Sequence, residues 1–518
     1  MAALQFDAPT ELAVDGEGNM MEACSSSDDD SLSSDGAAAF GPPIARIAIA
    51  GAGFSGAILA RQLSMEPNVE VICFEKSAQN AVRKHWTQPV TGAGLNINPN
   101  AMATLTQQDP ELARQLRGIG LPRESVRAST LTGRQIYEQD MVKEGLADTH
   151  GCRVRWDDAN TLIRSAAGGC IRWETTVDDH VVNEDGTIDI TLGHADGSSS
   201  IERGFDLLVA GEGRYSGVRA RATPNLETTF GNVCNFRILV PNAQPDGSQW
   251  PAEYGEAGLF DDLQLIYNDT PSMENLATDS KLRGDREFES CVMRSTPRVG
   301  IMRIPKSTFK SEVGESLYIF GNFAIPDGGD VPAGSKTAEA MHCMFTPAGG
   351  EDAMTPEGRF IRETLSTNAT DLHWSRFQDI SVQYSDESRG VLMLGDACHA
   401  FCPSLGQGAT TSIEDACVAA SELQAALRGK TTTDSHECVV AALKEAVGNI
   451  SKRQSDRVSF IRDISTEAGH HLRFLDGETD GVGCLQEDAL AWTDDNHPSG
   501  WRSKIQQVWL GYPRLTEA

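Results

Sequence analysis

The chain has 518 residues, 40% of them hydrophobic and 23% charged, which suffices for two or three domains with cores of their own. It carries 44 Lys and Arg against 74 Asp and Glu, and the net charge of −30 disfavours binding to nucleic acid or to anionic lipid. No apolar run reaches the roughly 20 residues that a membrane helix needs. Because the 12 cysteines include no C-x-x-C pair, we expect free thiols, a reducing cytoplasmic location and no metal site.

The N-terminal segment differs from the rest in composition. Residues 1–45 hold nine acidic residues and neither Lys nor Arg. This pattern fits neither a secretory signal nor a mitochondrial transit peptide. It predicts a disordered acidic tail over residues 1–43, to which we assign no activity.

The rest of the chain alternates between two kinds of pattern. A buried strand at Arg46–Ala50, a glycine-rich turn, a helix and a second strand at Val69–Phe74 predict a βαβ unit. Short β-rich runs separated by turns predict a mostly antiparallel sheet, and a strand, glycine turn and helix return after Arg389. We therefore expect an α/β fold with a discontinuous Rossmann-like nucleotide-binding domain (44–222 and 385–430), a β-sheet substrate domain (223–384) and a helical C-terminal region (431–518).

Gly51, Gly53 and Gly56 form a G-x-G-x-x-G motif between the first strand and helix. In such a turn the first glycine permits the sharp bend, the second lets a pyrophosphate approach the backbone, and the third lets helix and strand pack closely. Glu75 closes the second strand 24 residues after Gly51, where a carboxylate can accept ribose hydroxyls. A carboxylate there repels a 2′-phosphate, so this site favours FAD or NAD over NADP.

Two further motifs indicate a family. They are GEGRYSGVR within Leu207–Ala220 and LGDACHAFCPSLGQGATTSIEDA within Val391–Ala416, in addition to GAGFSG at residues 51–56. Together with GAGLNINPNAMATL (Gly92–Leu105), they resemble the fingerprint, DG motif, GD motif and flavin-side glycine segment of the class A FAD-dependent aromatic hydroxylases. This family includes salicylate, 4-hydroxybenzoate and 6-hydroxynicotinate hydroxylases, and the resemblance covers about residues 44–430.

The resemblance implies a set of FAD-binding residues. Asp396 ends a strand at the carboxyl edge of the predicted sheet, where its carboxylate can accept a ribityl hydroxyl. Gly406, Gln407 and Gly408 lead into a helix whose N–H groups can face the flavin pyrimidine ring. Arg155 occupies the position of the family arginine that reaches the FAD ribose and pyrophosphate; a surface ion pair is the alternative.

Two features depart from the family pattern. Glu212 stands in the DG motif where the family usually has Asp, so its FAD and nicotinamide contacts do not carry over directly. Val90 and Thr91 stand where the family often has Arg before the glycine segment.

Candidate catalytic residues are fewer. His85, in the RKHW segment before the glycine segment, could serve as a base or proton relay, or be an ordinary loop histidine. His399 follows the GD motif, and we expect a structural role for it. Two strands resemble the pocket strands of hydroxynicotinate-type hydroxylases and bring Arg237 and Arg303. Arg303 shares a strand face with Ile301 and could bind a substrate carboxylate or phenolate, or else pair with a surface acid.

The resemblance implies a flavoprotein monooxygenase, an oxidoreductase of aromatic compound metabolism. NADH or NADPH would reduce FAD, O2 would form a flavin C4a-hydroperoxide, and one oxygen would hydroxylate a small phenol, aromatic acid or hydroxypyridine. The chain has a single G-x-G-x-x-G, so the nicotinamide must dock transiently. We expect a monomer or homodimer.

Three alternatives remain. One is an FAD-dependent epoxidase or reductase of the same fold, and another is a redox-silent flavin-binding regulatory protein. A flavin-dependent halogenase would carry a W-x-W-x-I-P signature, which this sequence lacks.

Overall fold

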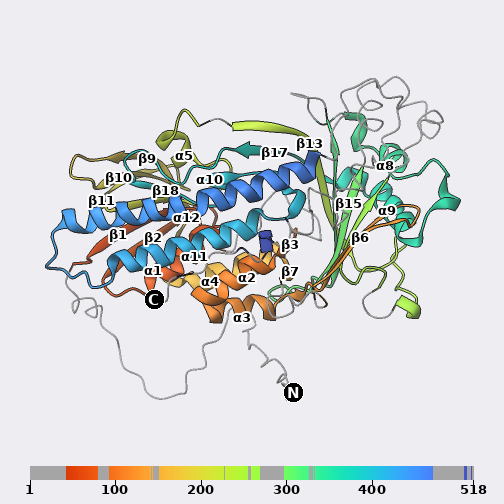
Figure 1. Cartoon of the computed structure of the whole chain (residues 1–518), viewed down its shortest axis with the longest axis horizontal. Helices are drawn as coiled ribbons and strands as arrows, with labels where there is room; N and C mark the ends of the chain where they lie inside the picture. The colour runs from red at the N-terminus through yellow and green to blue at the C-terminus, as the bar shows by residue number, and fades with distance from the viewer. Residues whose placement is uncertain are drawn as a thin grey trace, which may run out of the picture.

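The computed structural model describes residues 42–79, 93–141, 151–226, 228–254, 258–268, 297–325 and 333–470, with isolated positions at 143, 331, 504, 507–509, 511 and 515. Nearly all of the predicted acidic tail and much of the region after residue 470 lie outside these residues. The order of the elements along the chain is shown in Figure 1.

A five-stranded parallel sheet forms the centre of the nucleotide-binding part, in the order β18, β12, β1, β2, β8. The middle strand β1 has an almost unbroken apolar sequence because it is buried on both sides, which is typical of parallel sheets. The strands are β1 (Ala45–Ala50), β2 (Val69–Glu75), β8 (Ile171–Trp173), β12 (Leu207–Ala210) and β18 (Val391–Met393). The last strand, β18, begins about 180 residues after the end of β12, as the returning strand pattern predicted.

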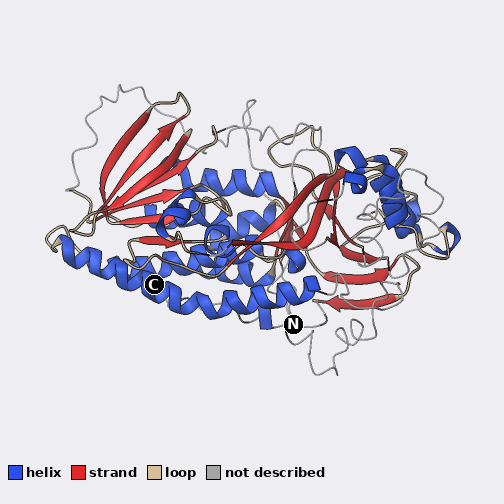
Figure 2. Ribbon diagram, turned by 90° about the horizontal axis from the view of Figure 1, so that it is seen from above, coloured by secondary structure: helices blue, strands red, loops and turns tan. Residues whose placement is uncertain are grey.

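Helices surround this sheet. Helix α11 packs against α1, α2 and α12, while α4 packs against α1 and α3 against α2. Figure 2 shows the helices gathered between the smaller strands at one end and the long strands at the other. The helices are α1 (Phe54–Ser64), α2 (Pro99–Gln108), α3 (Pro110–Gly118), α4 (Trp156–Ala167), α5 (Gly217–Ala222), α10 (Asp396–His399), α11 (Gly408–Leu427) and α12 (His436–His470).

Two small antiparallel sheets flank the nucleotide-binding part. One is a meander of β9 (Thr175–Val182), β10 (Ile188–His194) and β11 (Ser199–Phe205). The other places β7 (Cys152–Arg155) between β3 (Gly94–Ile97) and β4 (Leu121–Pro122). This second sheet carries the glycine segment and Arg155, and it lies beside the large sheet described next, because β7 contacts its strand β15.

The second major unit is a seven-stranded sheet in the order β17, β13, β16, β15, β14, β5, β6, antiparallel except for the β14–β5 pair. Its strands are β5 (Ser125–Thr130), β6 (Gln135–Asp140), β13 (Thr228–Pro241), β14 (Leu263–Tyr267), β15 (Arg298–Ile304), β16 (Ser316–Ala324) and β17 (His373–Ile380). Helices α8 (Ala338–Met344) and α9 (Pro356–Thr367) cover it on the side away from the first sheet (Figure 1). The predicted division of the chain assigned residues 125–140 to the nucleotide-binding domain, whereas β5 and β6 extend this sheet.

The buried apolar residues form two clusters. The larger joins the parallel sheet, its helices and one face of the seven-stranded sheet. The smaller lies between the other face of that sheet and helices α8 and α9. The α/β prediction, with a parallel nucleotide-binding sheet, a mostly antiparallel second sheet and a C-terminal helix, is confirmed.

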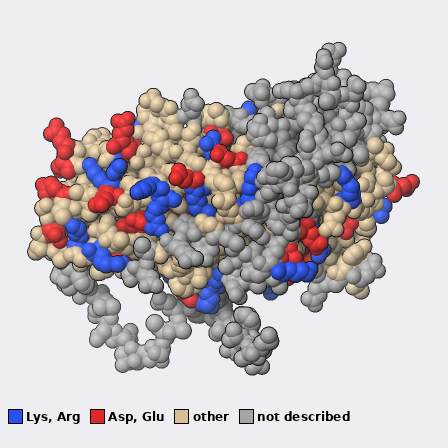
Figure 3. Space-filling view, viewed as in Figure 1, with Lys and Arg blue, Asp and Glu red and all other residues tan. Residues whose placement is uncertain are grey.

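The surface in Figure 3 carries acidic and basic side chains interspersed over the nucleotide-binding part. Among the described residues, no helix combines the length and the apolar character needed to cross a bilayer.

Candidate active site

The glycine motif forms the turn between β1 and α1. Gly51 has a φ of +91°, and a Cβ there would lie 2.7 Å from the carbonyl oxygen of Gly211. A Cβ on Gly56 would lie 2.0 Å from the Gly51 carbonyl oxygen. Gly53 is different, because its Cβ would meet a single atom, at 3.7 Å. The fold itself therefore requires Gly51 and Gly56, while Gly53 leaves room for a ligand to approach the backbone.

This turn also fits an anion. Helix α1 begins after Gly53 without a capping side chain, so its first N–H groups are available to a phosphate. The open space at Gly53 and the uncapped helix start together match the pyrophosphate of a dinucleotide such as FAD.

Glu75 ends β2 beside the glycine turn, as predicted, and is 6% exposed. Its Oε2 accepts a hydrogen bond from the Ala52 N–H at 3.0 Å and lies 3.2 Å from Arg164 Nη2. Its Oε1 accepts from the N–H and hydroxyl of Ser77. Burial alone would raise the pKa of Glu75, but Arg164 and these donors outweigh burial and lower it. The carboxylate is therefore ionised and fixed against the turn; its contact with a ribose stays a prediction.

Glu212 stabilises the turn after β12. Its Oε2 accepts from the Ser216 hydroxyl at 2.5 Å and from the Val218 N–H at 3.1 Å, while Ser216 in turn caps α5 through the Arg219 N–H. Burial raises the pKa of Glu212, partly offset by these donors. The Glu212 side chain thus reaches the first turn of α5.

Asp396 and the Gly406–Gly408 loop lie next to each other. A Cβ on Gly408 would point toward Asp396 Oδ1 at 3.8 Å, and Gly406 has a left-handed φ of +62°. The Asp396 carboxylate has no hydrogen-bond partner among the described residues. Helix α11 begins after Gln407, again without a capping side chain. A free carboxylate can accept a hydrogen bond from a hydroxyl such as those of the FAD ribityl chain. The uncapped helix start can donate N–H groups to acceptors such as those of the flavin pyrimidine ring.

Arg155 is fully buried but is largely occupied by the protein. Its Nε donates to the Pro305 carbonyl at 2.9 Å, and its Nη2 donates to the Gly314 carbonyl at 2.5 Å and the Ser316 hydroxyl at 2.6 Å. Only Nη1 is buried without a partner. The guanidinium therefore ties β7 to the hairpin between β15 and β16, and Nη1 alone is left for the predicted cofactor contact.

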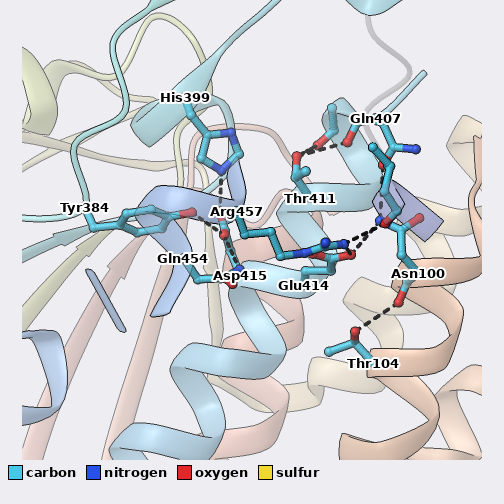
Figure 4. A network of polar contacts seen from close by, with 12 residues as sticks. Asn100, Thr104, Tyr384, His399, Gln407, Thr411, Glu414, Asp415, Gln454 and Arg457 are labelled. Carbon is cyan, nitrogen blue, oxygen red and sulfur yellow. Dashed lines mark hydrogen bonds and ion pairs between the residues drawn. The ribbon is translucent and has the colours of Figure 1, made fainter. Parts of the chain in front are cut away.

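Two adjacent carboxylates of α11 hold two segments in place, the short helix that carries Asp396 and the Gly406–Gly408 loop, which we call the cofactor loops (Figure 4). Asp415, fully buried, accepts from the Gly395 N–H at 2.9 Å and lies 2.6 Å from His399 Nε2. Tyr384 and Gln454 donate to its other oxygen. The structural role expected for His399 is supported by these contacts, since its ring fixes the short helix that carries Asp396.

Glu414 anchors the neighbouring loop. Arg457 of α12 pairs with both of its oxygens, at 2.7 and 2.8 Å. The Asn100 amide donates to Glu414 at 2.5 Å and to the Gln407 side chain at 3.2 Å (Figure 4). Helix α12 and the glycine segment thereby fix the residue at which α11 begins.

Asn98 and Thr410 make a second connection to the same loop. The Asn98 amide donates to the Gly406 carbonyl at 3.0 Å, and its backbone N–H donates to the Thr410 hydroxyl at 3.2 Å. Sequence reasoning missed Asn98, Asn100 and Glu414, although the repeated Asn within a buried segment, N-I-N-P-N, was a usable signal.

The seven-stranded sheet has two different faces. Val299 and Ile301 on one face, with Phe236 and Ile319 of neighbouring strands, form the apolar cluster against α8 and α9. The other face turns to the nucleotide-binding part and is polar and aromatic; the register aligns Asn235, Arg237, Tyr318, Phe320, Asn322, Arg298 and Tyr267 on it. This second face is where a substrate can lie against the cofactor.

Arg237 lies on the polar face, as its predicted role requires. It makes a side-chain hydrogen bond to Tyr318. The Tyr318 ring stacks with the Phe320 ring, with 5.2 Å between the ring centroids. It also packs so closely on Gly94 that a Cβ there would lie only 2.6 Å from Tyr318. The glycine segment thus allows an aromatic ring of the sheet to pack directly on the strand that the family places near the flavin.

Arg303 is placed differently from its prediction. It shares a face with Ile301, as expected, but that face packs toward α8 and α9. Its Nε lies 3.6 Å from Glu315 Oε1. The alternative reading of Arg303 as an arginine paired with an acid is the one that this geometry supports. His85, with Val90 and Thr91, lies outside the described residues.

Comparisons with known proteins match the chain segments that contain these residues. Residues 364–442 match the family model of an FAD binding domain, and residues 48–156 match an FAD-NAD(P)-binding model. The dual trans-enoyl reductase/FAD-dependent monooxygenase tazHJ of Aspergillus terreus is 23% identical over 474 residues. That match covers 89% of this chain, and the chain spans only 58% of the length of this relative.

Solved structures share the fold over most of the chain. HpxO of Klebsiella pneumoniae, solved with FAD and uric acid, superposes with a TM-score of 0.60 at 16% identity, covering 90% of this chain and 97% of that one. The 2-methyl-3-hydroxypyridine-5-carboxylic acid oxygenase gives a TM-score of 0.56 at 16% identity, covering 90% and 98%. The chain therefore carries two segments that match FAD-binding models, and it shares the fold of these solved flavoproteins.

Proposed function

We propose that the protein is an FAD-dependent monooxygenase that uses NAD(P)H and O2 to hydroxylate a small aromatic substrate. The observation that carries this proposal is the polar and aromatic face of the seven-stranded sheet, which holds Arg237, Tyr318 and Phe320 and on which the Tyr318 ring packs against Gly94 of the glycine segment. An enzyme of this type needs an apolar ring site with few well-placed polar groups next to the cofactor.

FAD would be held by the Gly53 turn, Glu75, Asp396 and the start of α11, and when bound it would supply the redox chemistry that activates O2. The start of α11 at Gly408 offers N–H groups and a positive helix end to negative charge on the bound ring. The buried carboxylates Glu414 and Asp415 hold that helix start and Asp396 rigidly, so little reorganisation is needed when charge develops.

Tyr318 would stabilise the ionised form of the substrate by donating a hydrogen bond to it. Burial raises the pKa of its phenol, partly offset by Arg237, so the hydroxyl is protonated at neutral pH and can donate to a phenolate oxygen. The Arg237 guanidinium supports the negative charge that a substrate gains when it loses its proton. Phe320, stacked on Tyr318, helps to exclude water from the ring site.

The cytoplasmic location remains part of this proposal. It is supported by the described cysteines, all of which are free thiols.

The test is to purify the protein, record its flavin absorbance, and screen phenols, aromatic acids and hydroxypyridines for stimulated NAD(P)H and O2 consumption. A hydroxylated product, identified by mass, is the expected result. A protein that retains FAD but oxidises NAD(P)H equally with and without every compound would refute the hydroxylase proposal. The same outcome would favour the regulatory alternative.

A further inference from the structure

Arg298 is a buried cation at the start of β15, on the polar face of the seven-stranded sheet. It stands in register with Tyr267 on one side and Asn322 on the other, and it is 6% exposed. Its guanidinium makes no hydrogen bond or ion pair with any residue that the structure describes. It lies over the Tyr267 ring only at a distance, 6.0 Å from the centroid. The guanidinium donors on this polar face of the sheet are therefore available to a ligand, and their planar fork suits an anion.

The other two arginines of these strands are already engaged. Arg303 faces the opposite side and pairs with Glu315, and Arg237 bonds to Tyr318. Arg298 is thus distinguished from both by having its donors available on the face where the substrate would lie.

Asn322 adds a second free group at the same place. It is 4% exposed, and its Oδ1 is buried without a hydrogen-bond partner. Directly paired residues on neighbouring strands have Cβ atoms about 5 Å apart, so the Asn322 amide and the Arg298 side chain start side by side. A cation and an acceptor oxygen, both unsatisfied, therefore adjoin each other.

This pair lies close to the cofactor loops. Burial raises the pKa of the Cys402 thiol, and the positive charge of Arg298 is one of the groups that oppose this rise. Cys402 lies between Asp396 and Gly406, so the guanidinium is within electrostatic range of the segment joining the two loops. From the strand spacing, Arg298 and Arg237 stand roughly 12 Å apart along the face, enough for one aromatic ring with substituents at both ends.

We propose that Arg298 and Asn322 bind the acid end of the substrate, as a second polar anchor in addition to Arg237 and Tyr318. The planar fork of Arg298 matches a carboxylate, and Asn322 Oδ1 accepts from a hydroxyl or ring N–H next to that carboxylate. The anchor therefore selects an aromatic carboxylate with a neighbouring hydrogen-bond donor. That the bound acid is the substrate rests on the proposed function. That Arg298 and Asn322 bind an aromatic acid does not depend on it.

The experiment measures binding to the purified holoprotein by titration calorimetry, with no turnover. Salicylate, which has a hydroxyl beside its carboxylate, is paired with uncharged salicylamide, and hydroxypyridine carboxylic acids are paired with their carboxamides. Wild-type protein should bind at least one acid more tightly than its amide. Arg298→Met should weaken that acid 10- to 100-fold and the amide less than threefold, and Arg298→Lys should recover part of the loss.

Arg303→Met is the matched control, because it removes the same charge from the same strand on the opposite face. It should change the affinity for acid and amide by less than threefold. The proposal is overturned if no acid is preferred by wild-type protein, if Arg298→Met keeps the preference, or if Arg303→Met loses it. A preferred acid that binds through Arg298 but stimulates no NAD(P)H oxidation would instead refute the hydroxylase function while the anchor stands.

Discussion

Replacing Arg457 by Leu should expose how strongly the start of α11 depends on helix α12. Arg457 makes two charged hydrogen bonds to Glu414, which is fully buried, and a third to the Val508 carbonyl at 3.0 Å. Without it, the Glu414 carboxylate keeps only the Asn100 amide as a partner. Removing one member of a buried ion pair costs about 3 to 5 kcal/mol, because the other charge is left uncompensated.

The assay compares urea unfolding and FAD retention of Arg457→Leu with those of Arg462→Leu. Arg462 lies on the same helix and pairs with Asp379, but its side chain is 29% exposed, so its loss should cost about 1 kcal/mol or less. A double variant with Glu414→Leu should recover part of the stability lost in Arg457→Leu, since no buried charge remains. If Arg457→Leu and Arg462→Leu unfold at the same urea concentration, the proposed role of the buried pair is refuted.

Three other predictions test the site. Gly53→Val should abolish FAD binding while leaving the fold intact, whereas Gly56→Val should fail to fold. Circular dichroism reports the fold and flavin absorbance reports the bound FAD. Normal flavin binding by Gly53→Val would contradict the pyrophosphate assignment. Asp396→Ala should weaken FAD by about 1.5 to 3 kcal/mol, measured by flavin fluorescence, and an unchanged affinity would remove it from the cofactor site. Burial disfavours the charged forms of both His399 and Asp415. The Asp415 carboxylate outweighs burial and raises the pKa of His399, and His399 in turn lowers the pKa of Asp415. Their contribution should be full between about pH 4 and 6.5, and should be lost as pH rises through the His399 pKa or falls through that of Asp415; a His399→Gln variant with the same alkaline profile as wild type would argue against it.

The glycine motifs could be predicted because they follow from local geometry. Gly51 has a positive φ, and a Cβ on Gly56 would lie 2.0 Å from the Gly51 carbonyl oxygen. Both positions therefore require glycine, and the glycine spacing in the sequence predicts the turn. The apolar run of β1 likewise indicates a strand buried on both sides. These features need only neighbouring residues for their interpretation.

The roles of charged side chains could not be read in the same way. Arg155 has the residue type and position of a cofactor ligand, yet its Nε and Nη2 donate to residues 305–316, about 150 positions away in the chain. Arg303 and Ile301 share a face, as alternation predicts, but alternation does not say which face meets the cofactor. That depends on which cluster each face packs into, and the second cluster is completed by helices α8 and α9 beyond the strand.

The same reasoning explains why Arg298 is the informative arginine. In a sheet with one face closed by helices, a charge on the closed face must bring its own partner, and Arg303 does so through Glu315. On the open face the partner can be a ligand, because no residue that the structure describes forms a hydrogen bond or an ion pair with Arg298. Arg298→Met should therefore leave the stability of the protein unchanged or increase it, while Arg303→Met removes an ion pair of Glu315, which keeps the Asn242 amide as its partner.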